Sequence, residues 1–291
     1  GEVLYTFTGS SYDIGGLAFS PDGRSLLTWG NGGGPAWVWD ISGDGEDKAS
    51  SGEIRQFSDI EGNIRYAAFS PDGVYVLTGG FGGLAQLWDA TSGEEIRRFA
   101  GHPSYVSSVA FSPDGRYALT SSSSTAFLWD VSTGEQIRAF RGHTDTVVAV
   151  AFSPDGRTIL TASIDWSARL WDTASGNQIL VLARYNQSAN AGAFSHDGRF
   201  VITGSSDHTA RVWDAASGTL VHVLEGSGAI SAVAFSADDR FIYTDGDGNV
   251  MQVWDAASGH LVRNTPGPAL DGPEIAFSPD GRYVASGGDD N

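Results

Sequence analysis

The phrase Ala-Phe-Ser-Pro-Asp-Gly at residues 151–156, followed by Trp-Asp at 171–172, decides the fold because both phrases recur along the chain. The first is intact at 18–23, 68–73, 110–115, 151–156 and 276–281. It is altered at 193–198, where His196 replaces Pro, and at 234–239, where Ala237 and Asp239 intrude. The Phe residues of the seven copies are separated by 50, 42, 41, 42, 41 and 42 residues. This regular period predicts a repeat architecture.

Each unit is predicted to contain four short strands. In the unit around residue 150, the expected strands are 146–152, 158–163, 168–171 and 178–182. The first is almost continuously apolar, which is typical of a strand buried on both faces, and no window shows a helical period. Pro-Asp-Gly at 154–156 is typical of a tight turn. The excess of Gly, 39 of 291 residues, agrees with many such turns.

The phased Trp-Asp pairs carry a family resemblance. They lie at 39–40, 88–89, 129–130, 171–172, 213–214 and 254–255. Together with the seven Phe-Ser phrases, they make the chain resemble the WD-repeat family over essentially its whole length. The resemblance implies an all-β fold, a seven-bladed β-propeller of four-stranded antiparallel blades that forms one domain over 1–291.

The seventh unit is expected to be split between the two ends of the chain. Gly1 to Phe7 matches an outermost strand, and Gly287 to Asn291 matches the turn before a third strand. In the family, an N-terminal strand commonly closes the last blade, and closure protects sheet edges. The third strand of this blade, with its Trp-Asp, is absent. We expect that the sequence is a fragment of a longer chain with additional domains; the alternative is that a partner strand fills the slot.

Composition excludes several kinds of partner. The formal net charge of −18 argues against nucleic acid and against an anionic membrane surface. No apolar stretch is long enough to insert into a membrane. The chain has no Cys, which excludes disulfides and removes the commonest ligand of structural zinc. The compartment stays open, with the cytoplasm slightly favoured.

One set of polar residues looks like a catalytic triad. His143, Ser163, Asp165 and Trp171 match the four positions at which the family builds a buried hydrogen-bond chain within a blade. The resemblance therefore implies a structural staple, and a satisfied polar network of this kind specifies a unique core. The other units depart from the pattern, so the complete set is expected in this unit alone.

Two further motifs are interpreted as turns, and no catalytic, cofactor or metal site is predicted. Residues 80–85 match the dinucleotide fingerprint but lie inside a predicted hairpin, without the helix that binds pyrophosphate. Residues 245–249 resemble the start of a calcium loop, but position twelve is Ala256 instead of Glu.

Binding residues are expected on the loops of one face. The connections before first strands and the turns between second and third strands lie at the same end of every blade. The residues predicted to gather on this face are Tyr12, Trp29, Asn31, Phe81, Tyr105, Trp166, Tyr185 and His208. Aromatic side chains favour interface hot spots. The alternative, that some of them pack on neighbouring turns, stays open.

Two classes of function remain at this point. The resemblance implies a non-catalytic scaffold that presents its faces to protein or peptide partners, within a larger signalling or assembly protein. The alternative is a propeller enzyme or small-ligand binder that uses the central channel. The innermost strands carry Val, Ala, Ile, Ser and Gly, as in 230–234, and few groups suited to chemistry. The scaffold is therefore the preferred prediction, although a fold alone does not establish function.

Overall fold

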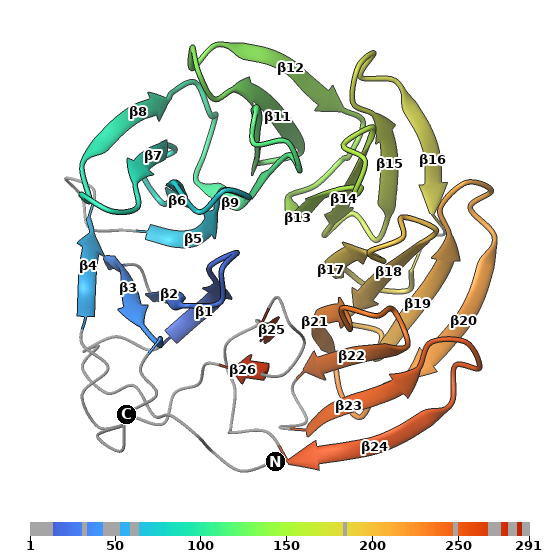
Figure 1. Cartoon of the computed structure of the whole chain (residues 1–291). Coiled ribbons are helices and arrows are strands. Elements are labelled where there is room, and N and C mark those ends of the chain that lie inside the picture. The colour runs from blue at the N-terminus through green and yellow to red at the C-terminus, as the bar shows by residue number, and fades with distance from the viewer. Residues whose placement is uncertain are drawn as a thin grey trace.

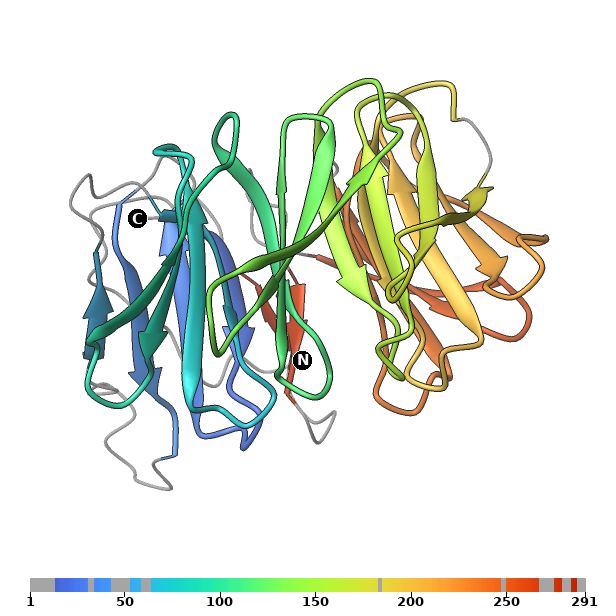
Figure 2. The ribbon, with the colours of Figure 1, turned by 90° about the horizontal axis from the view of Figure 1, so that it is seen from above.

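The computed structural model describes residues 14–30, 34–42, 53–58, 64–182, 185–246, 250–266, 275–278 and 284–286. These residues form β-strands joined by turns. Six four-stranded antiparallel sheets and one two-stranded sheet are arranged as a ring (Figure 1), which Figure 2 shows from the side. The prediction of an all-β propeller built from four-stranded antiparallel blades is confirmed.

Each of the six blades is formed by four consecutive strands. Blade 1 contains β1 (Ile14–Phe19), β2 (Ser25–Gly30), β3 (Ala36–Asp40) and β4 (Glu53–Phe57), and blade 2 contains β5 (Ile64–Phe69), β6 (Tyr75–Gly80), β7 (Ala85–Asp89) and β8 (Glu95–Phe99). Blade 3 contains β9 (Val106–Phe111), β10 (Tyr117–Ser122), β11 (Thr125–Asp130) and β12 (Gln136–Arg141), and blade 4 contains β13 (Val147–Phe152), β14 (Thr158–Ser163), β15 (Ala168–Asp172) and β16 (Gln178–Leu182). Blade 5 contains β17 (Ala189–Phe194), β18 (Phe200–Ser205), β19 (Thr209–Asp214) and β20 (Leu220–Glu225), and blade 6 contains β21 (Ile230–Phe235), β22 (Phe241–Gly246), β23 (Val250–Asp255) and β24 (Leu261–Pro266).

The first strand of each blade lies at the centre of the ring and the fourth at its rim (Figure 1). This position explains the composition of each strand. The second strand is covered by neighbouring blades, so β14 buries every residue from Ile159 to Ser163. The fourth strand is covered on one side only, and β16 exposes Gln178, Ile179 and Val181.

The apolar core lies between the blades. The layer between blades 3 and 4 combines Leu119, Leu128 and Phe140 with Ile159 and Trp171, all nearly inaccessible to solvent. Equivalent layers join each blade of the six to the next, and in each layer the Trp of one blade packs against its predecessor. Because burial of apolar surface is the main favourable contribution to folding, blades stabilise one another through these shared layers.

A β-bulge that the sequence pattern did not predict recurs beside the Trp of each Trp-Asp pair. In blade 3, Leu128 pairs with Arg138 and Trp129 pairs with Gln136, so Ile137 is the extra residue. The extra residue is Ile or Val in all six blades, and Ile137 has 44% of its surface exposed. The bulge increases the local twist and turns this aliphatic side chain toward the rim.

The structure corrects the predicted count of seven blades to six. Six are four-stranded, and the described part of the seventh unit is a two-stranded sheet of β25 (Ile275–Phe277) and β26 (Val284–Ser286). This sheet lies between β21 and β1 and so occupies the remaining sector of the ring (Figure 1). The predicted N-terminal closing strand, Gly1 to Phe7, and the predicted end, 287–291, lie outside the described residues. The sequence pattern gives the number of repeats, but the pairing of strands determines how many repeats form four-stranded sheets.

The Ser-Pro-Asp-Gly phrases form the predicted turns between first and second strands. In blade 4, Ser153 Oγ donates to Asp155 Oδ1 at 2.6 Å, and Gly156 has a left-handed backbone with φ of 71°. Gly is favoured there because it has no Cβ. These turns and those between third and fourth strands share one end of each blade, which we call the bottom face; the opposite end is the top face.

The two altered turns of the repeat compensate each other across a blade boundary. In the regular repeat, the Gly of one turn lies beside the Pro of the preceding blade, as Gly198 lies beside Pro154. His196 stands at the Pro position in the turn of blade 5, and Asp239 stands at the Gly position in the turn of blade 6. The Asp239 carboxylate accepts hydrogen bonds from the His196 backbone N–H at 2.8 Å and from His196 Nδ1 at 3.0 Å. A polar contact therefore replaces an apolar one.

Candidate functional site

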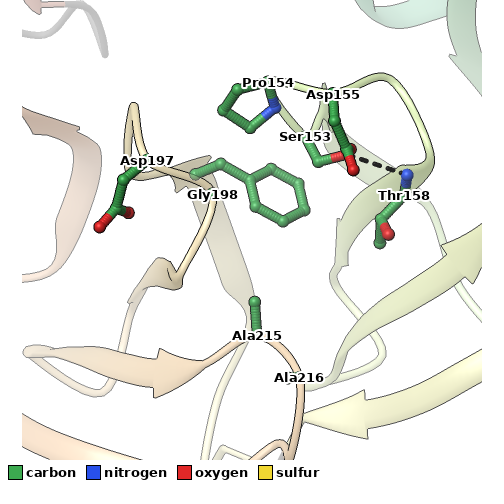
Figure 3. Close-up of a pocket in the computed structure, with 9 residues that line it drawn as sticks. Ser153, Pro154, Asp155, Thr158, Asp197, Gly198, Ala215 and Ala216 are labelled. Carbon is green, nitrogen blue, oxygen red and sulfur yellow. Dashed lines mark hydrogen bonds between the residues drawn. The ribbon is translucent and has the colours of Figure 1, made fainter.

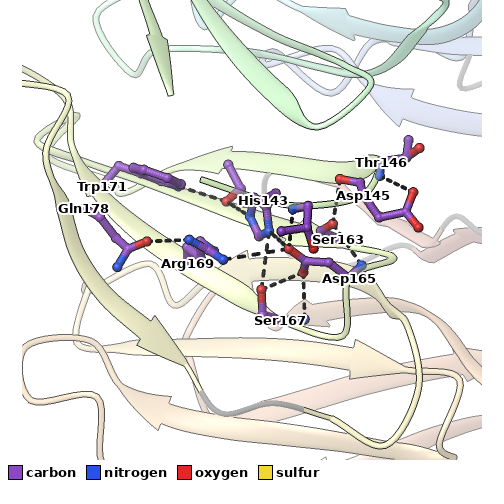
Figure 4. A network of polar contacts seen from close by, with 11 residues as sticks. His143, Asp145, Thr146, Ser163, Asp165, Ser167, Arg169, Trp171 and Gln178 are labelled. Atoms are coloured by element: carbon purple, nitrogen blue, oxygen red, sulfur yellow. Dashed lines mark hydrogen bonds and ion pairs between the residues drawn. The ribbon is translucent and has the colours of Figure 1, made fainter. Parts of the chain in front are cut away.

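A buried hydrogen-bond chain crosses blade 4, where the staple was predicted (Figure 4). Trp171 Nε1–H donates to Thr161 Oγ1 at 2.9 Å, and Thr161 Oγ1 lies 2.7 Å from His143 Nε2. His143 Nδ1 lies 2.8 Å from Asp165 Oδ2. Because the indole can only donate, the Thr161 hydroxyl donates to His143, whose Nδ1–H donates to Asp165. Every polar atom along this chain has a partner.

The hydroxyl in this chain belongs to Thr161, which corrects the prediction of Ser163. Ser163 Oγ instead donates to the Asp145 carbonyl at 3.0 Å and accepts from the Asp165 backbone N–H at 3.1 Å. The two residues lie on the same side of β14, and the tertiary position of the imidazole places it opposite the first of them. Ser163 therefore holds the connection before β13 against the turn after β14.

The electrostatics of the staple agree with a structural role. Burial lowers the pKa of His143, although the hydrogen bond and charge of Asp165 oppose the shift. Burial would raise the pKa of Asp165, but hydrogen bonds from Ser167, the Thr144 backbone N–H and His143 lower it overall. The imidazole therefore stays neutral at neutral pH, and Thr161 is 1% exposed. A nucleophile must reach its substrate, and this hydroxyl is enclosed.

The bond between Trp and Thr occurs in all six blades, which the sequence analysis missed. The Trp–Thr pairs are Trp39–Thr28, Trp88–Thr78, Trp129–Thr120, Trp171–Thr161, Trp213–Thr203 and Trp254–Thr244, with donor–acceptor distances from 2.8 to 3.0 Å. The signal was present in the sequence, since a Thr stands 9 to 11 residues before each Trp. A recurring buried hydroxyl fixes the ring orientation of a recurring buried indole.

Blades 3 and 5 complete the chain in different ways. His102 Nε2 lies 2.8 Å from Thr120 Oγ1, and His102 Nδ1–H donates to the Gly83 carbonyl of blade 2 at 3.2 Å. In blade 5 the Tyr185 hydroxyl contacts Thr203 Oγ1. Burial lowers the pKa of His102 to about 4 and raises that of Tyr185 to about 12, so both side chains are neutral at neutral pH.

The predicted top-face residues divide into exposed and buried groups. Phe81 is 45% exposed, Trp166 is 53% exposed, and His208 is also exposed. Tyr105 is half-buried, with its ring centroid 6.1 Å from that of Phe81. Tyr12 and Asn31 lie outside the described residues. We call Phe81, Tyr105, Trp166 and His208 the aromatic patch.

The prediction that Trp29 and Tyr185 lie exposed on the binding face is wrong. Each is 2% exposed: Trp29 packs in the layer between blades 1 and 2, and Tyr185 in that between blades 4 and 5. Trp29 follows Thr28 on β2, at a position that faces the next blade. Tyr185 takes the place that His143 has in blade 4. The alternative that some of these residues pack on neighbours is therefore correct for these two.

The turns that carry Trp166 and His208 have an unusual backbone. Both residues have φ of 69°, and the corresponding position in blade 2 is Gly83, with φ of 66°. A left-handed conformation costs an L-residue about 1–2 kcal/mol. Because a Gly would avoid this cost, an exposed Trp there calls for a reason other than folding.

The two motifs interpreted as turns are partly described. Residues 80–85 lie between β6 and β7, with Gly83 in a left-handed turn and no helix, which confirms that interpretation. In the calcium-like segment, 247–249 lie outside the described residues, and burial raises the pKa of Asp245. Within the described ranges, no three His, Cys, Asp or Glu side chains form a group that could hold a metal.

A cleft of about 450 Å³ opens on the bottom face between blades 4 and 5 (Figure 3). Its lining residues are Ser153, Pro154, Asp155, Thr158, Phe194, Asp197, Gly198, Ala215 and Ala216. The lining is apolar in its centre and carries one carboxylate from each blade. We call it the blade 4–5 cleft. Sequence reasoning did not predict it.

The comparisons with known proteins agree with this geometry. In the part of the chain that the structure describes, no helix is long and apolar enough to cross a membrane. No curated protein matches the sequence. The family described as WD domain, G-beta repeat matches residues 1–45, 53–89, 93–130, 134–172, 176–214, 218–255 and 274–291, which are six full repeats and a partial one. From 53 to 255, each match spans the outer strand of one blade and the first three strands of the next. The matches cover most of the chain, so the protein belongs to the WD40 repeat family.

Proposed function

We propose that this protein is a non-catalytic interaction scaffold that binds a protein or peptide partner through the aromatic patch on its top face. WD40 propellers generally serve as protein-interaction scaffolds and are typically non-catalytic. The observation that carries the proposal is Trp166, which combines 53% exposure with a left-handed backbone. Exposed aromatic residues contribute strongly to binding when a partner covers them. A partner that excludes water from Trp166 would account for both features.

The other residues of the aromatic patch lie on top-face connections of other blades, and Trp166 has a rigid support. Phe81 contacts Tyr105, and the Arg65 guanidinium lies 5.4 Å from the Phe81 ring centroid. The Trp166 carbonyl accepts from the Tyr185 backbone N–H at 2.8 Å, and Asp165 beside it belongs to the staple. The staple therefore holds the turn that presents Trp166. Loops on a rigid scaffold are common binding sites.

Trp166→Gly tests the proposal without destabilising the turn. Gly suits the backbone at this position, so the melting temperature should stay close to that of the wild type. Partners captured from native extract by the immobilised wild type should be lost by Trp166→Gly. Val74→Ala is the matched control, because Val74 is 44% exposed at a bottom-face turn. Unchanged capture by Trp166→Gly, or equal loss with Val74→Ala, would contradict the proposal.

We further propose that β25 and β26 begin a seventh blade that the segment Gly1–Phe7 closes, so that 1–291 behaves as one domain. The position of β25 between β21 and β1 supports this arrangement. Deletion of residues 1–7 should then lower the melting temperature by several degrees. A deletion variant that melts like the full chain would show that the segment does not contribute to closure.

A further inference from the structure

The blade 4–5 cleft lies where blade 4, like blade 1 with Ser25, departs from the other blades at one position. Where β14 begins with Thr158, the second strands of blades 2, 3, 5 and 6 begin with Tyr75, Tyr117, Phe200 and Phe241. The Tyr117 ring packs in the layer between blades 3 and 4, and the Phe200 ring in that between blades 5 and 6. The layer between blades 4 and 5 has no such ring, and the short Thr158 side chain lines the cleft.

Small residues on blade 5 widen the same space. The turn between β19 and β20 contributes Ala215 and Ala216 to the cleft, where the turn of blade 3 has Val131 and Ser132. Phe194 and Pro154 complete an apolar lining. Such a lining suits the aliphatic stem of a long side chain, and an aromatic ring attracts a cation.

The charges beside the cleft select a positive group. Asp155 and Asp197 each use Oδ1 within their own turn, accepting from Ser153 Oγ at 2.6 Å and from Ser195 Oγ at 2.7 Å. These hydrogen bonds lower the pKa of both carboxyl groups, which are therefore ionised at neutral pH. Within the described residues, Asp197 Oδ2 accepts no hydrogen bond.

The native cation beside the cleft is held loosely. Arg157 Nε lies 4.0 Å from Asp155 Oδ2, and its side chain is 86% exposed. In blades 3, 5 and 6 the arginine that follows this turn lies over the adjacent ring, as Arg199 lies 4.9 Å from the Phe200 centroid. Arg157 has no adjacent ring, because the next residue is Thr158. An exposed ion pair of this kind contributes little and is easily displaced.

We propose that the blade 4–5 cleft binds a lysine or arginine side chain from a basic protein segment, with the stem against Phe194, Pro154 and the two alanines and the charge beside the carboxylate of Asp155 or Asp197. The net charge of −18 favours the approach of such a segment. This site lies on the bottom face and is independent of the aromatic patch.

The test uses a phage-displayed library of random peptides selected on the immobilised wild-type chain. Selected peptides should share a Lys or Arg, and their binding, measured by fluorescence anisotropy, should weaken as salt is raised. Thr158→Tyr restores the ring of the regular repeat and should fill the cleft, weakening these peptides about tenfold or more. Ser25→Tyr is the matched control, since it makes the same change at the equivalent position of blade 1 and should leave affinity unchanged.

A second pair of variants separates charge from shape. Asp155→Asn and Asp197→Asn keep the Oδ1 acceptor that each turn uses but remove the charge. Binding should weaken, and the melting temperature should fall only slightly, by the stability that the ionised carboxylate contributes. Trp166→Gly should bind the selected peptides like the wild type. The proposal is overturned if no peptide is enriched, if enriched peptides share no basic residue, or if Thr158→Tyr binds like Ser25→Tyr. Loss of binding in Trp166→Gly, or undiminished binding in both Asn variants, would also overturn it.

Discussion

Thr161 is the residue on which the polar interior of blade 4 depends, because its hydroxyl joins the Trp171 indole to the His143 imidazole. Thr161→Val removes the hydroxyl but keeps the shape, and so leaves two buried groups without partners. Each unsatisfied group costs roughly 1–3 kcal/mol, so a loss of about 2–6 kcal/mol in the free energy of unfolding is expected. Urea denaturation measures it.

Thr173→Val is the control for that prediction. The Thr173 hydroxyl is buried and has no hydrogen-bond partner, so its removal should leave stability unchanged or raise it slightly. If both variants lose the same free energy, the effect comes from the substitution and the hydrogen-bond chain contributes nothing. Partner binding at the top face should persist in Thr161→Val below its melting temperature, because the His143–Asp165 hydrogen bond that holds the Trp166 turn does not involve Thr161.

The lowered pKa of His102 predicts how the free energy of unfolding changes with pH. Burial lowers its pKa from 6.5 to about 4 in the native state. Between these pH values the unfolded chain binds a proton at this residue that the native chain does not. The contribution of His102 to the free energy of unfolding is therefore full at neutral pH and is lost as the pH falls from about 6.5 toward 4. The loss should be on the order of 2–3 kcal/mol. His102→Gln should lose less stability than the wild type between pH 7.5 and 4.5 in urea denaturation; an equal loss would contradict the prediction.

At the scale of elements, the contact between the turns of blades 5 and 6 makes two irregular residues depend on each other. His196→Pro removes the N–H donor, and Asp239→Gly removes the carboxylate that accepts it, although Gly suits the φ of 55° at that position. The double variant restores the Pro and Gly that the regular repeat has at this contact. A double-mutant cycle in urea should give a coupling energy of about 1 kcal/mol, whereas effects that add within about 0.3 kcal/mol would show that the turns are independent.

At the scale of the whole molecule, two sets of aspartates repeat around the ring. One set lies in the turns between first and second strands, and the other stands at the ends of third strands. Hydrogen bonds from hydroxyl and backbone N–H groups lower the pKa of Asp22, Asp40, Asp72, Asp89, Asp130, Asp155, Asp172, Asp197, Asp214, Asp238 and Asp255. At Asp114 burial opposes these bonds, and the pKa is still lowered. Since their native pKa values lie below the ordinary value near 3.8, these groups stabilise the fold above that pH.

That stabilisation should disappear in acid. As the pH falls from about 4 through the native pKa values, the unfolded chain takes up protons first, so the free energy of unfolding decreases steeply. Circular dichroism of the strands from pH 5 to 2 should show one cooperative loss, because adjacent blades share their apolar layers. Retention of native strand signal at pH 2 would contradict this prediction, as would separate transitions for different blades.

The sequence by itself determined the repeat, the strands and the turns, because these depend on residues close together in the chain. Ser-Pro-Asp-Gly forms the same kind of turn in each described repeat that carries it, and the apolar stretches between turns form strands. The Trp that marks each third strand was equally visible, and the Thr to which it donates could have been found from its constant spacing. His143 and Asp165, whose positions the family resemblance supplied, form a hydrogen bond in the structure.

Only the tertiary structure decided what happens between blades, because those contacts join residues about forty positions apart in a chain whose repeats look alike. Between blades it buried Trp29 and Tyr185 in inter-blade layers. Within blade 4 it placed Thr161, rather than Ser163, opposite His143, 18 residues away in the chain. It also showed six complete blades where seven repeats were counted. The short Thr158 side chain lines the blade 4–5 cleft, where most blades have an aromatic ring. Whether such a departure from the repeat leaves a cleft depends on how the residue packs against the next blade, and local propensity does not determine this packing.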